Sequence, residues 1–157
     1  MITVRVARPG DGAALWQTTR ALAEHHDFMA GFVVQPQDFE RDLFCDHPVI
    51  GALIAEDDGV LAGSALWHRS YSTNRGREIM YLEDVVVLPE HRRKGVARAL
   101  FKAVAQTALA RGYGKIYWMV MDWNAEAKAL YASLGADIDP DHRLCTIDGE
   151  ALKALAQ

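Results

Sequence analysis

The feature that most constrains how this chain can fold is a β-rich stretch that runs through a short basic turn directly into a strong helix. Residues 81–88 are mostly apolar, residues 92–94 are Arg-Arg-Lys, and Gly95 begins a helix predicted to end near Arg111. The first N–H groups of a helix have no intrahelical partner and lie at its positive end. A glycine also lets a ligand approach the backbone closely. The segment therefore predicts an anion site suited to a pyrophosphate.

Two better-known phosphate motifs do not fit this turn. The Gly-x-x-x-x-Gly-Lys-Ser/Thr spacing of a P-loop is absent, and the dinucleotide fingerprint needs three glycines where the turn has one. A nucleotide-binding protein is therefore disfavoured. The residues of the turn alone leave one further alternative, a basic and solvated start of a helix that binds nothing.

The order of the predicted elements indicates an α/β fold (mixed, α+β-like) with helices on both faces of the sheet. Alternation, apolar periodicity, caps and turn residues predict each element. Residues 57–59, Asp-Asp-Gly, predict a hairpin, residues 70–76 a loop, and Asp11 and Asn124 two helix N-caps. One domain is expected over residues 1–157. The predicted strands are 2–7, 49–56, 60–68, 78–88, 115–121 and 144–147, and the predicted helices are 11–26, one from about 36, 95–111, one from 124 to 135, and 150–156.

Composition disfavours several classes of function. Seventeen Lys and Arg against 21 Asp and Glu give a formal net charge of -4, whereas nonspecific binding to nucleic acid or acidic membranes needs a basic excess. The apolar runs fall far short of the ~20 residues of a membrane span, and no signal-like segment precedes the first strand. The chain is expected in the cytoplasm, with Cys45 and Cys145 reduced. His25 and His26 point about 100° apart on a helix, so no metal is expected.

The basic turn and four further motifs resemble a known enzyme family. Residues 92–97, Arg-Arg-Lys-Gly-Val-Ala, are similar to the Arg/Gln-x-x-Gly-x-Gly/Ala signature of the GNAT superfamily of acetyl-CoA-dependent N-acetyltransferases. The wider context resembles the diamine (spermidine/spermine) acetyltransferase branch, from Arg8-Pro9 to the C-terminus. The motifs that carry this likeness are Tyr71-Ser72-Thr73, Tyr81-Leu82-Glu83-Asp84, Asp122-Trp123-Asn124, and Leu130-Tyr131 through Gly135-Ala136.

The resemblance implies a GNAT-type fold, with a central sheet that is splayed where acetyl-CoA binds, and a homodimer. It implies direct transfer of acetyl to a primary amine of a small molecule: a diamine, a polyamine, or an amino acid like lysine or thialysine. Two alternatives stay open. One is an acetyltransferase acting on a peptide or protein amine, and the other is a non-catalytic module that senses acetyl-CoA.

The resemblance also implies a role for particular residues. Tyr131 and Glu83 would be catalytic. Acetyl-CoA would be bound by Val85, Val86, Val87, Arg92, Arg93, Lys94, Gly95, Val96, Ala97, Arg98, Asn124 and Lys128, with the pyrophosphate held by main-chain N–H groups of residues 93–98. The amine would be bound by His25, His26, Glu83, Asp84, Trp118 and Met119.

The chemistry of amine acetylation fits these residue types. An alkyl ammonium has a pKa of ~10 and must lose a proton before it attacks. Glu83 is the candidate to accept that proton, with Asp84 behind it, and Tyr131 can donate a hydrogen bond to the leaving thiolate. Strand alternation places Glu83 with Val85 on one face and Asp84 with Leu82 on the other, unless a bulge intervenes.

The roles implied for Tyr131, Glu83 and Asn124 each have a purely structural alternative. Tyr131 fits a helix core, Glu83 fits an ion-paired strand residue, and Asn124 fits a helix cap alone. The chain also departs from the polyamine branch, because His26 and Asn74 replace an expected acidic residue and a tryptophan, and His142 replaces a late aromatic residue. A long polycation needs carboxylates along its path, so these departures favour a shorter amine.

Overall fold

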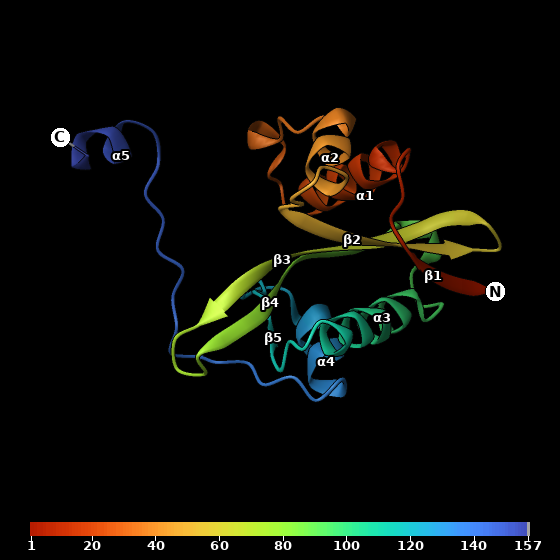
Figure 1. The fold of residues 1–157 in the computed structure, drawn as a ribbon. Coiled ribbons are helices and arrows are strands. Elements are labelled where there is room, and N and C mark those ends of the chain that lie inside the picture. The colour runs from red at the N-terminus through yellow and green to blue at the C-terminus, as the bar shows by residue number, and fades with distance from the viewer. Residues whose placement is uncertain (157) are drawn as a thin grey trace. The chain divides into compact units, whose positions relative to one another are not determined.

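A five-stranded sheet organises the first part of the chain. The computed structural model describes residues 1–156, in two compact units that cover residues 1–119 and residues 120–156. Neighbouring strands of the sheet are antiparallel, except for the parallel pair β4–β5 (Figure 1). The strands lie in chain order: β1 (Ile2–Val6), β2 (Ile50–Asp57), β3 (Val60–Ser72), β4 (Arg77–Val87) and β5 (Ile116–Tyr117).

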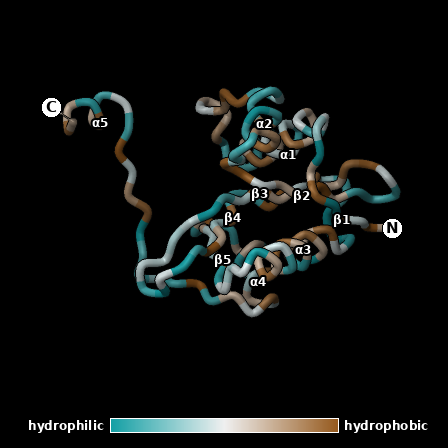
Figure 2. Tube along the Cα trace, in the orientation of Figure 1, coloured by the Kyte–Doolittle hydropathy of each residue, from teal (hydrophilic) through white to brown (hydrophobic). Residues whose placement is uncertain are grey.

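Helices cover both faces of this sheet, as predicted. α1 (Gly12–His25) and α2 (Pro36–Leu43) lie on one face, and α3 (Val96–Ala110) lies on the other (Figure 1). The short 3-10 helices η1 (Met29–Gly31) and η2 (Pro89–His91) follow α1 and β4. Each face has its own apolar core, one built around Leu15 and Ile54 and the other around Met80 and Leu100. Figure 2 shows apolar residues along both the strands and α3.

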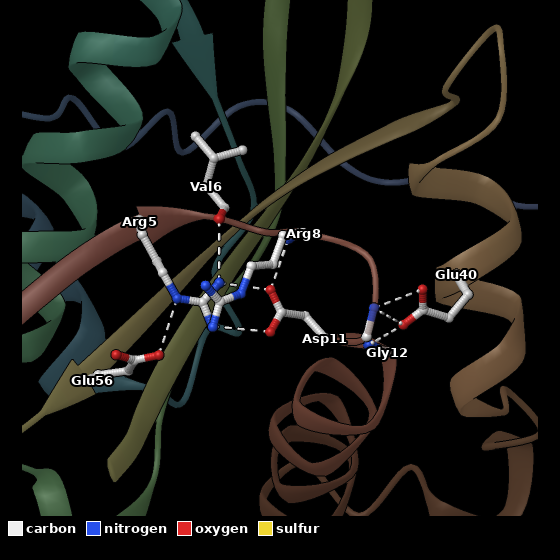
Figure 3. Close-up of polar contacts among 8 residues, drawn as sticks. Arg5, Val6, Arg8, Asp11, Gly12, Glu40 and Glu56 are labelled. Carbon is white, nitrogen blue, oxygen red and sulfur yellow. Dashed lines mark hydrogen bonds and ion pairs between the residues drawn. The ribbon is translucent and has the colours of Figure 1, made fainter. Parts of the chain in front are cut away.

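A network of charged side chains fastens the α1–α2 layer to the edge of the sheet (Figure 3). The Arg5 guanidinium donates to both carboxylate oxygens of Asp11, at 2.6 and 2.9 Å, and to Glu56 at 3.0 Å. Glu40 of α2 accepts the N–H of Gly12 at 2.7 Å, so α2 supplies the acceptor at the start of α1. The predicted side-chain cap by Asp11 is wrong, because its carboxylate is held by Arg5.

The hairpin between β2 and β3 has the predicted turn. Asp58 and Gly59 both have positive φ, 51° and 80°, which is the geometry of a type I′ turn. Asp57 and Val60 face each other across it. β3 continues to Ser72, so it takes in the first residues of the predicted loop 70–76, because they pair with the start of β4.

The second unit, described by itself, contains α4 (Ala125–Ser133) and α5 (Gly149–Leu155). The predicted cap is confirmed, since the Asn124 side chain accepts the N–H of Ala127 at 3.0 Å. One predicted strand is shorter than expected, and another is absent. β5 has two residues instead of the seven of 115–121, and residues 144–147 are exposed and form no strand. Among the described residues, no strand pairs with residues 144–147 and supplies ladder hydrogen bonds.

Candidate active site

The strand β4 contains a bulge at Glu83. Leu82 pairs with Trp67 of β3, but Leu66, the residue before Trp67, pairs with Asp84. Glu83 is therefore an extra residue with no partner opposite it. A bulge bends its strand and re-aims side chains, and bulges are over-represented beside active sites.

The bulge reverses which face the following residues occupy. Val85 packs on the same core as Met80 and Leu82, against α3. Asp84 instead lies opposite Leu66, which belongs to the core under α1 and α2. The bulge is the exception under which strict alternation was not expected to hold. Asp84 does not share a face with Leu82, because one inserted residue shifts the two-residue period. Asp84 shares its face with Tyr81.

Acidic and aromatic side chains gather on this face of the sheet. His68 lies opposite Tyr81 and stacks on its ring, with centroids 4.8 Å apart, and its Nε2 is 3.7 Å from Glu83 Oε2. The ring of Tyr117 meets Tyr81 edge-on, also at 4.8 Å. Carboxylates beside aromatic rings form a surface that attracts a cationic amine.

Within this group, the carboxyl of Asp84 has a strongly shifted pKa. Burial, and then the negative charge of Glu83, raise the pKa of the half-buried Asp84 carboxyl to about 6. Burial and the charge of Glu83 also raise the pKa of the Tyr81 phenol. Perturbed acids beside a specific charge cluster at functional sites. Two carboxylates so close also favour the approach of a cation, which relieves their repulsion.

The predicted anion site lies where β4 passes into α3. After η2 the backbone is extended at Arg92, turns left-handed at Arg93 (φ 62°) and again at Gly95 (φ 87°), and then enters α3 at Val96. A left-handed arginine is strained, and such strain is typical of a backbone fixed for binding. Successive turn N–H groups in this kind of conformation form an anion-binding concavity. No atom outside the neighbouring residues lies within 4 Å of a Cβ built on Gly95, so the backbone there can be approached.

The side chains of this turn differ in what they contact. Arg92, Arg93 and Lys94 are all exposed. Lys94 Nζ nevertheless lies 3.4 Å from Asp57 Oδ2 at the end of β2. The buried His91 donates from Nδ1 to the same oxygen at 3.2 Å. The turn is therefore joined to the β2–β3 hairpin.

The other predicted amine-binding residues of this unit lie in two places. His25 and the half-buried His26 are at the end of α1, on the Asp84 side of the sheet, with their rings 5.4 Å apart. Burial, and then the charge of His25, lower the pKa of His26. Trp118 packs against Phe101 of α3 at 5.4 Å, on the opposite face, and Met119 is exposed.

The predicted residues of the second unit are described within that unit. Asn124 caps α4, and Lys128 of α4 donates to the backbone oxygen and the carboxylate of Asp122, at 2.6 and 2.5 Å. Tyr131, one turn further along α4, is half-buried. The loop and the first turn of α4 are therefore held together by Asn124 and Lys128.

Sequence reasoning missed His68 and Asp57. His68 sits in a strand, and nothing in its local pattern distinguishes it from an ordinary exposed strand residue. It joins Tyr81 and Glu83 only through the register of β3 on β4. Asp57 belongs to the Asp-Asp-Gly turn motif, and its contact with His91 spans 34 positions of sequence. The pairing of β3 with β4, with the bulge included, is the signal that finds His68. No local pattern signals the contact of Asp57 with His91.

Two cavities of the first unit lie elsewhere. One of about 260 Å³ is lined by the end of α3 and residues 113–116, and one of about 110 Å³ by residues of β1, β2 and α2 with Trp67 and Arg111. Neither is lined by the bulge or by the basic turn. Among residues 1–156, no group of three or more His, Cys, Asp or Glu side chains is placed to hold a metal ion. No helix in the same range is long and apolar enough to cross a membrane.

Comparisons with known proteins agree with this geometry. A profile of the acetyltransferase (GNAT) family matches residues 15–136. A thialysine N-epsilon-acetyltransferase of Bos taurus is 32% identical over 99% of this chain and 97% of its own length. An L-ornithine N5-acetyltransferase of Arabidopsis thaliana is 36% identical over 63% of this chain and 43% of its own length. The solved structure of an aminoglycoside N-acetyltransferase in complex with CoA has a TM-score of 0.74 at 22% identity, and the alignment covers 95% of each chain.

Proposed function

The chain belongs to the GNAT family of acetyltransferases, and from this premise we propose that it transfers the acetyl group of acetyl-CoA to the side-chain amine of a basic amino acid or a short diamine. The observation that carries the proposal is the bulge of β4, which gathers Glu83 and Asp84 beside Tyr81 on one strand. The same strand leads directly into the basic turn. One continuous segment, residues 81–98, thus supplies both an amine-binding surface and an anion site.

Acetyl-CoA is proposed to lie along this segment. Main-chain N–H groups of residues 93–98 hold the pyrophosphate at the start of α3, and the backbone of residues 85–87 pairs with the pantetheine arm like an added strand. Asn124 and Lys128 are proposed as further acetyl-CoA-binding residues. The proposal treats residues 1–157 as one acetyltransferase domain, acting as a cytoplasmic homodimer.

The two carboxylates are proposed to have different tasks. Glu83 is exposed enough to reach the amine and accepts its proton, directly or through water. Asp84 is half-buried and balances the charge of the incoming ammonium. The free amine attacks the thioester carbonyl, and the tetrahedral intermediate collapses to the amide as its C–S bond breaks. The nitrogen loses its second proton in this step, and the CoA thiolate, to which Tyr131 donates a hydrogen bond, takes up a proton and leaves as the thiol. No covalent acetyl-enzyme is needed.

The choice of acceptor is supported by the relatives as well as by this chain. The two enzymes compared above are named for the side-chain nitrogen of thialysine and of ornithine. In this chain the residue expected to contact a polyamine as an acid is His26, whose pKa is lowered by burial. A neutral imidazole gives a long polycation no counter-charge, whereas the Glu83–Asp84 pair is sufficient for one short amine.

The experiment follows release of CoA from acetyl-CoA over a panel of lysine, thialysine, ornithine, putrescine, spermidine and a short peptide with a free N-terminus. Glu83→Gln and Tyr131→Phe run beside the wild type. We expect turnover on one of the amino acids or on putrescine, with a fall in kcat of about a hundredfold in Glu83→Gln. Preference for the peptide would replace the proposal with protein acetylation. Tight acetyl-CoA binding with no turnover on any amine would instead support the alternative of a non-catalytic module that senses acetyl-CoA.

A further inference from the structure

An ionic cluster behind the basic turn suggests how the turn keeps its shape. Asp57 is the last residue of β2, and its carboxylate is the meeting point of three cationic or donor groups. Oδ2 receives His91 Nδ1 at 3.2 Å and Lys94 Nζ at 3.4 Å, and Oδ1 lies 3.5 Å from the ammonium of Met1. His91 and Lys94 flank Arg92 and Arg93, so both ends of the basic turn are attached to one carboxylate.

The surroundings make Asp57 a fixed support. Its strand β2 is hydrogen-bonded on both sides, to β1 and to β3. His91 is buried, with 8% of its surface exposed, so its imidazole has few alternatives to the Asp57 contact. The backbone near His91 is held as well, because Leu88 donates its N–H to Ala62 of β3 at 2.9 Å. The hydrogen bond from His91, and then the one from Lys94, lower the pKa of Asp57, which keeps it ionised.

The turn needs such support. Arg93 is left-handed at φ 62°, a conformation that is strained for a non-glycine residue and persists only where the surroundings impose it. The N–H groups of the turn converge on an anion only while that conformation holds.

From this geometry we infer that Asp57 is a positioning residue for acetyl-CoA, which holds the basic turn in its binding conformation through His91 and Lys94. The inference rests on the proposed function. It also assigns Lys94 a different task from direct contact between its ammonium and the phosphate. The ammonium is paired with Asp57, so the residue would contribute its backbone N–H to the anion site.

The two possible tasks of Lys94 predict opposite results for Asp57→Asn. Removal of a carboxylate beside an anion site strengthens anion binding if Lys94 contacts the phosphate directly, because the lysine is released and a repulsive charge is lost. The same change weakens binding if Asp57 holds the turn. Asp58→Asn is a matched control, since it removes the same charge from the neighbouring residue, and Asp58 pairs with Met1 but not with the turn.

The experiment measures the Kd of acetyl-CoA by calorimetry, using protein without an N-terminal tag because the Met1 ammonium belongs to the cluster. We expect about tenfold weaker binding in Asp57→Asn and in His91→Gln, and a change below about twofold in Asp58→Asn. In the transfer assay, KM for acetyl-CoA should rise while kcat stays within about twofold. Turnover with S-acetylpantetheine, which has the thioester but no pyrophosphate, should be unchanged.

Unchanged or tighter binding in Asp57→Asn would overturn the inference, and so would equal losses in Asp57→Asn and Asp58→Asn. A loss of binding that merely follows the fraction of unfolded protein, read from thermal unfolding of the same samples, would overturn it too. A wild type that does not bind acetyl-CoA at all would instead refute the proposed function. The two failures are therefore distinguishable.

Discussion

At the scale of single residues, Asp84 is the clearest case of a side chain whose charged form lowers the stability of the folded protein. Its folded pKa of about 6 lies above the ordinary value of 3.8, because burial and Glu83 disfavour its charge. A raised acid pKa means that its contribution to stability is fully present below about pH 4 and is lost as the pH rises through 6. At neutral pH the ionised carboxyl therefore destabilises the protein.

Asp84→Asn should consequently raise the free energy of unfolding at about pH 7.5. A shift of one pKa unit corresponds to 1.36 kcal/mol, and the partial exposure of Asp84 reduces the expected gain to about 1–2 kcal/mol. The gain should disappear near pH 4, and kcat/KM for the amine should fall. Chemical denaturation at the two pH values and the transfer assay test this. A variant less stable than wild type at pH 7.5 would contradict it.

Substitution of the two glycines at the ends of α3 distinguishes an effect on stability from an effect on acetyl-CoA binding. Gly95 precedes the helix and Gly112 follows it, both have positive φ (87° and 75°), and a Cβ on either meets nothing within 4 Å. Alanine at each position should therefore cost a similar amount, about 1 kcal/mol of left-handed strain. We expect only Gly95→Ala to weaken acetyl-CoA binding, by at least about tenfold. Equal effects on the Kd would rule out close approach of the cofactor at Gly95.

At the scale of elements, the Arg5–Asp11 ion pair joins β1 to the start of α1 (Figure 3). Asp11 accepts two bonds from Arg5 and one from the N–H of Arg8 at 2.7 Å. Asp11→Asn should lower the free energy of unfolding by about 1–3 kcal/mol, because charged hydrogen bonds are lost and the partly buried Arg5 guanidinium keeps only Glu56 as a charged partner. Asp42→Asn is the control, since the Arg41–Asp42 pair is exposed and contributes little.

The pH dependence of this effect has a definite sign. Arg5 first, and the Arg8 N–H, lower the pKa of Asp11. The stabilisation is therefore present above the ordinary carboxyl pKa of 3.8, and is lost as the pH falls through the lowered folded value. The difference between wild type and Asp11→Asn should shrink on acidification below about pH 4. A difference that grows there would contradict the ion-pair interpretation. Thermal unfolding across the acid range measures it.

At the scale of the whole molecule, the sequence predicted what depends on local chemistry. The hairpin follows from two residues that tolerate positive φ, Asp58 and Gly59, and α3 follows from its apolar period and Gly112. The basic turn was found because its residues are contiguous. The face of Asp84 was not predictable, since one unpaired residue in β4 changes it. Strand pairing likewise decides the short length of β5 and the contact of His68 with Glu83. The contact of Asp57 with His91 joins residues 34 positions apart, which no local pattern reveals.

The bulge at Glu83 makes a further prediction, for a deletion. Every paired residue of β3 already has a partner among the other residues of β4, so removing Glu83 alone leaves the whole ladder intact and restores strict alternation. Leu82, Val85 and Val87 stay on the α3 core, and Asp84 stays on the α1 face. The shortened protein should fold with a melting temperature no lower than wild type and should lose acetyl transfer. Failure to fold would show that the bulge is structural.

The β3–β4 ladder has no partner position for Glu83, so the sheet gains no backbone pairing from this residue. Deleting it therefore separates what β4 contributes to the sheet from what it contributes to acetyl transfer.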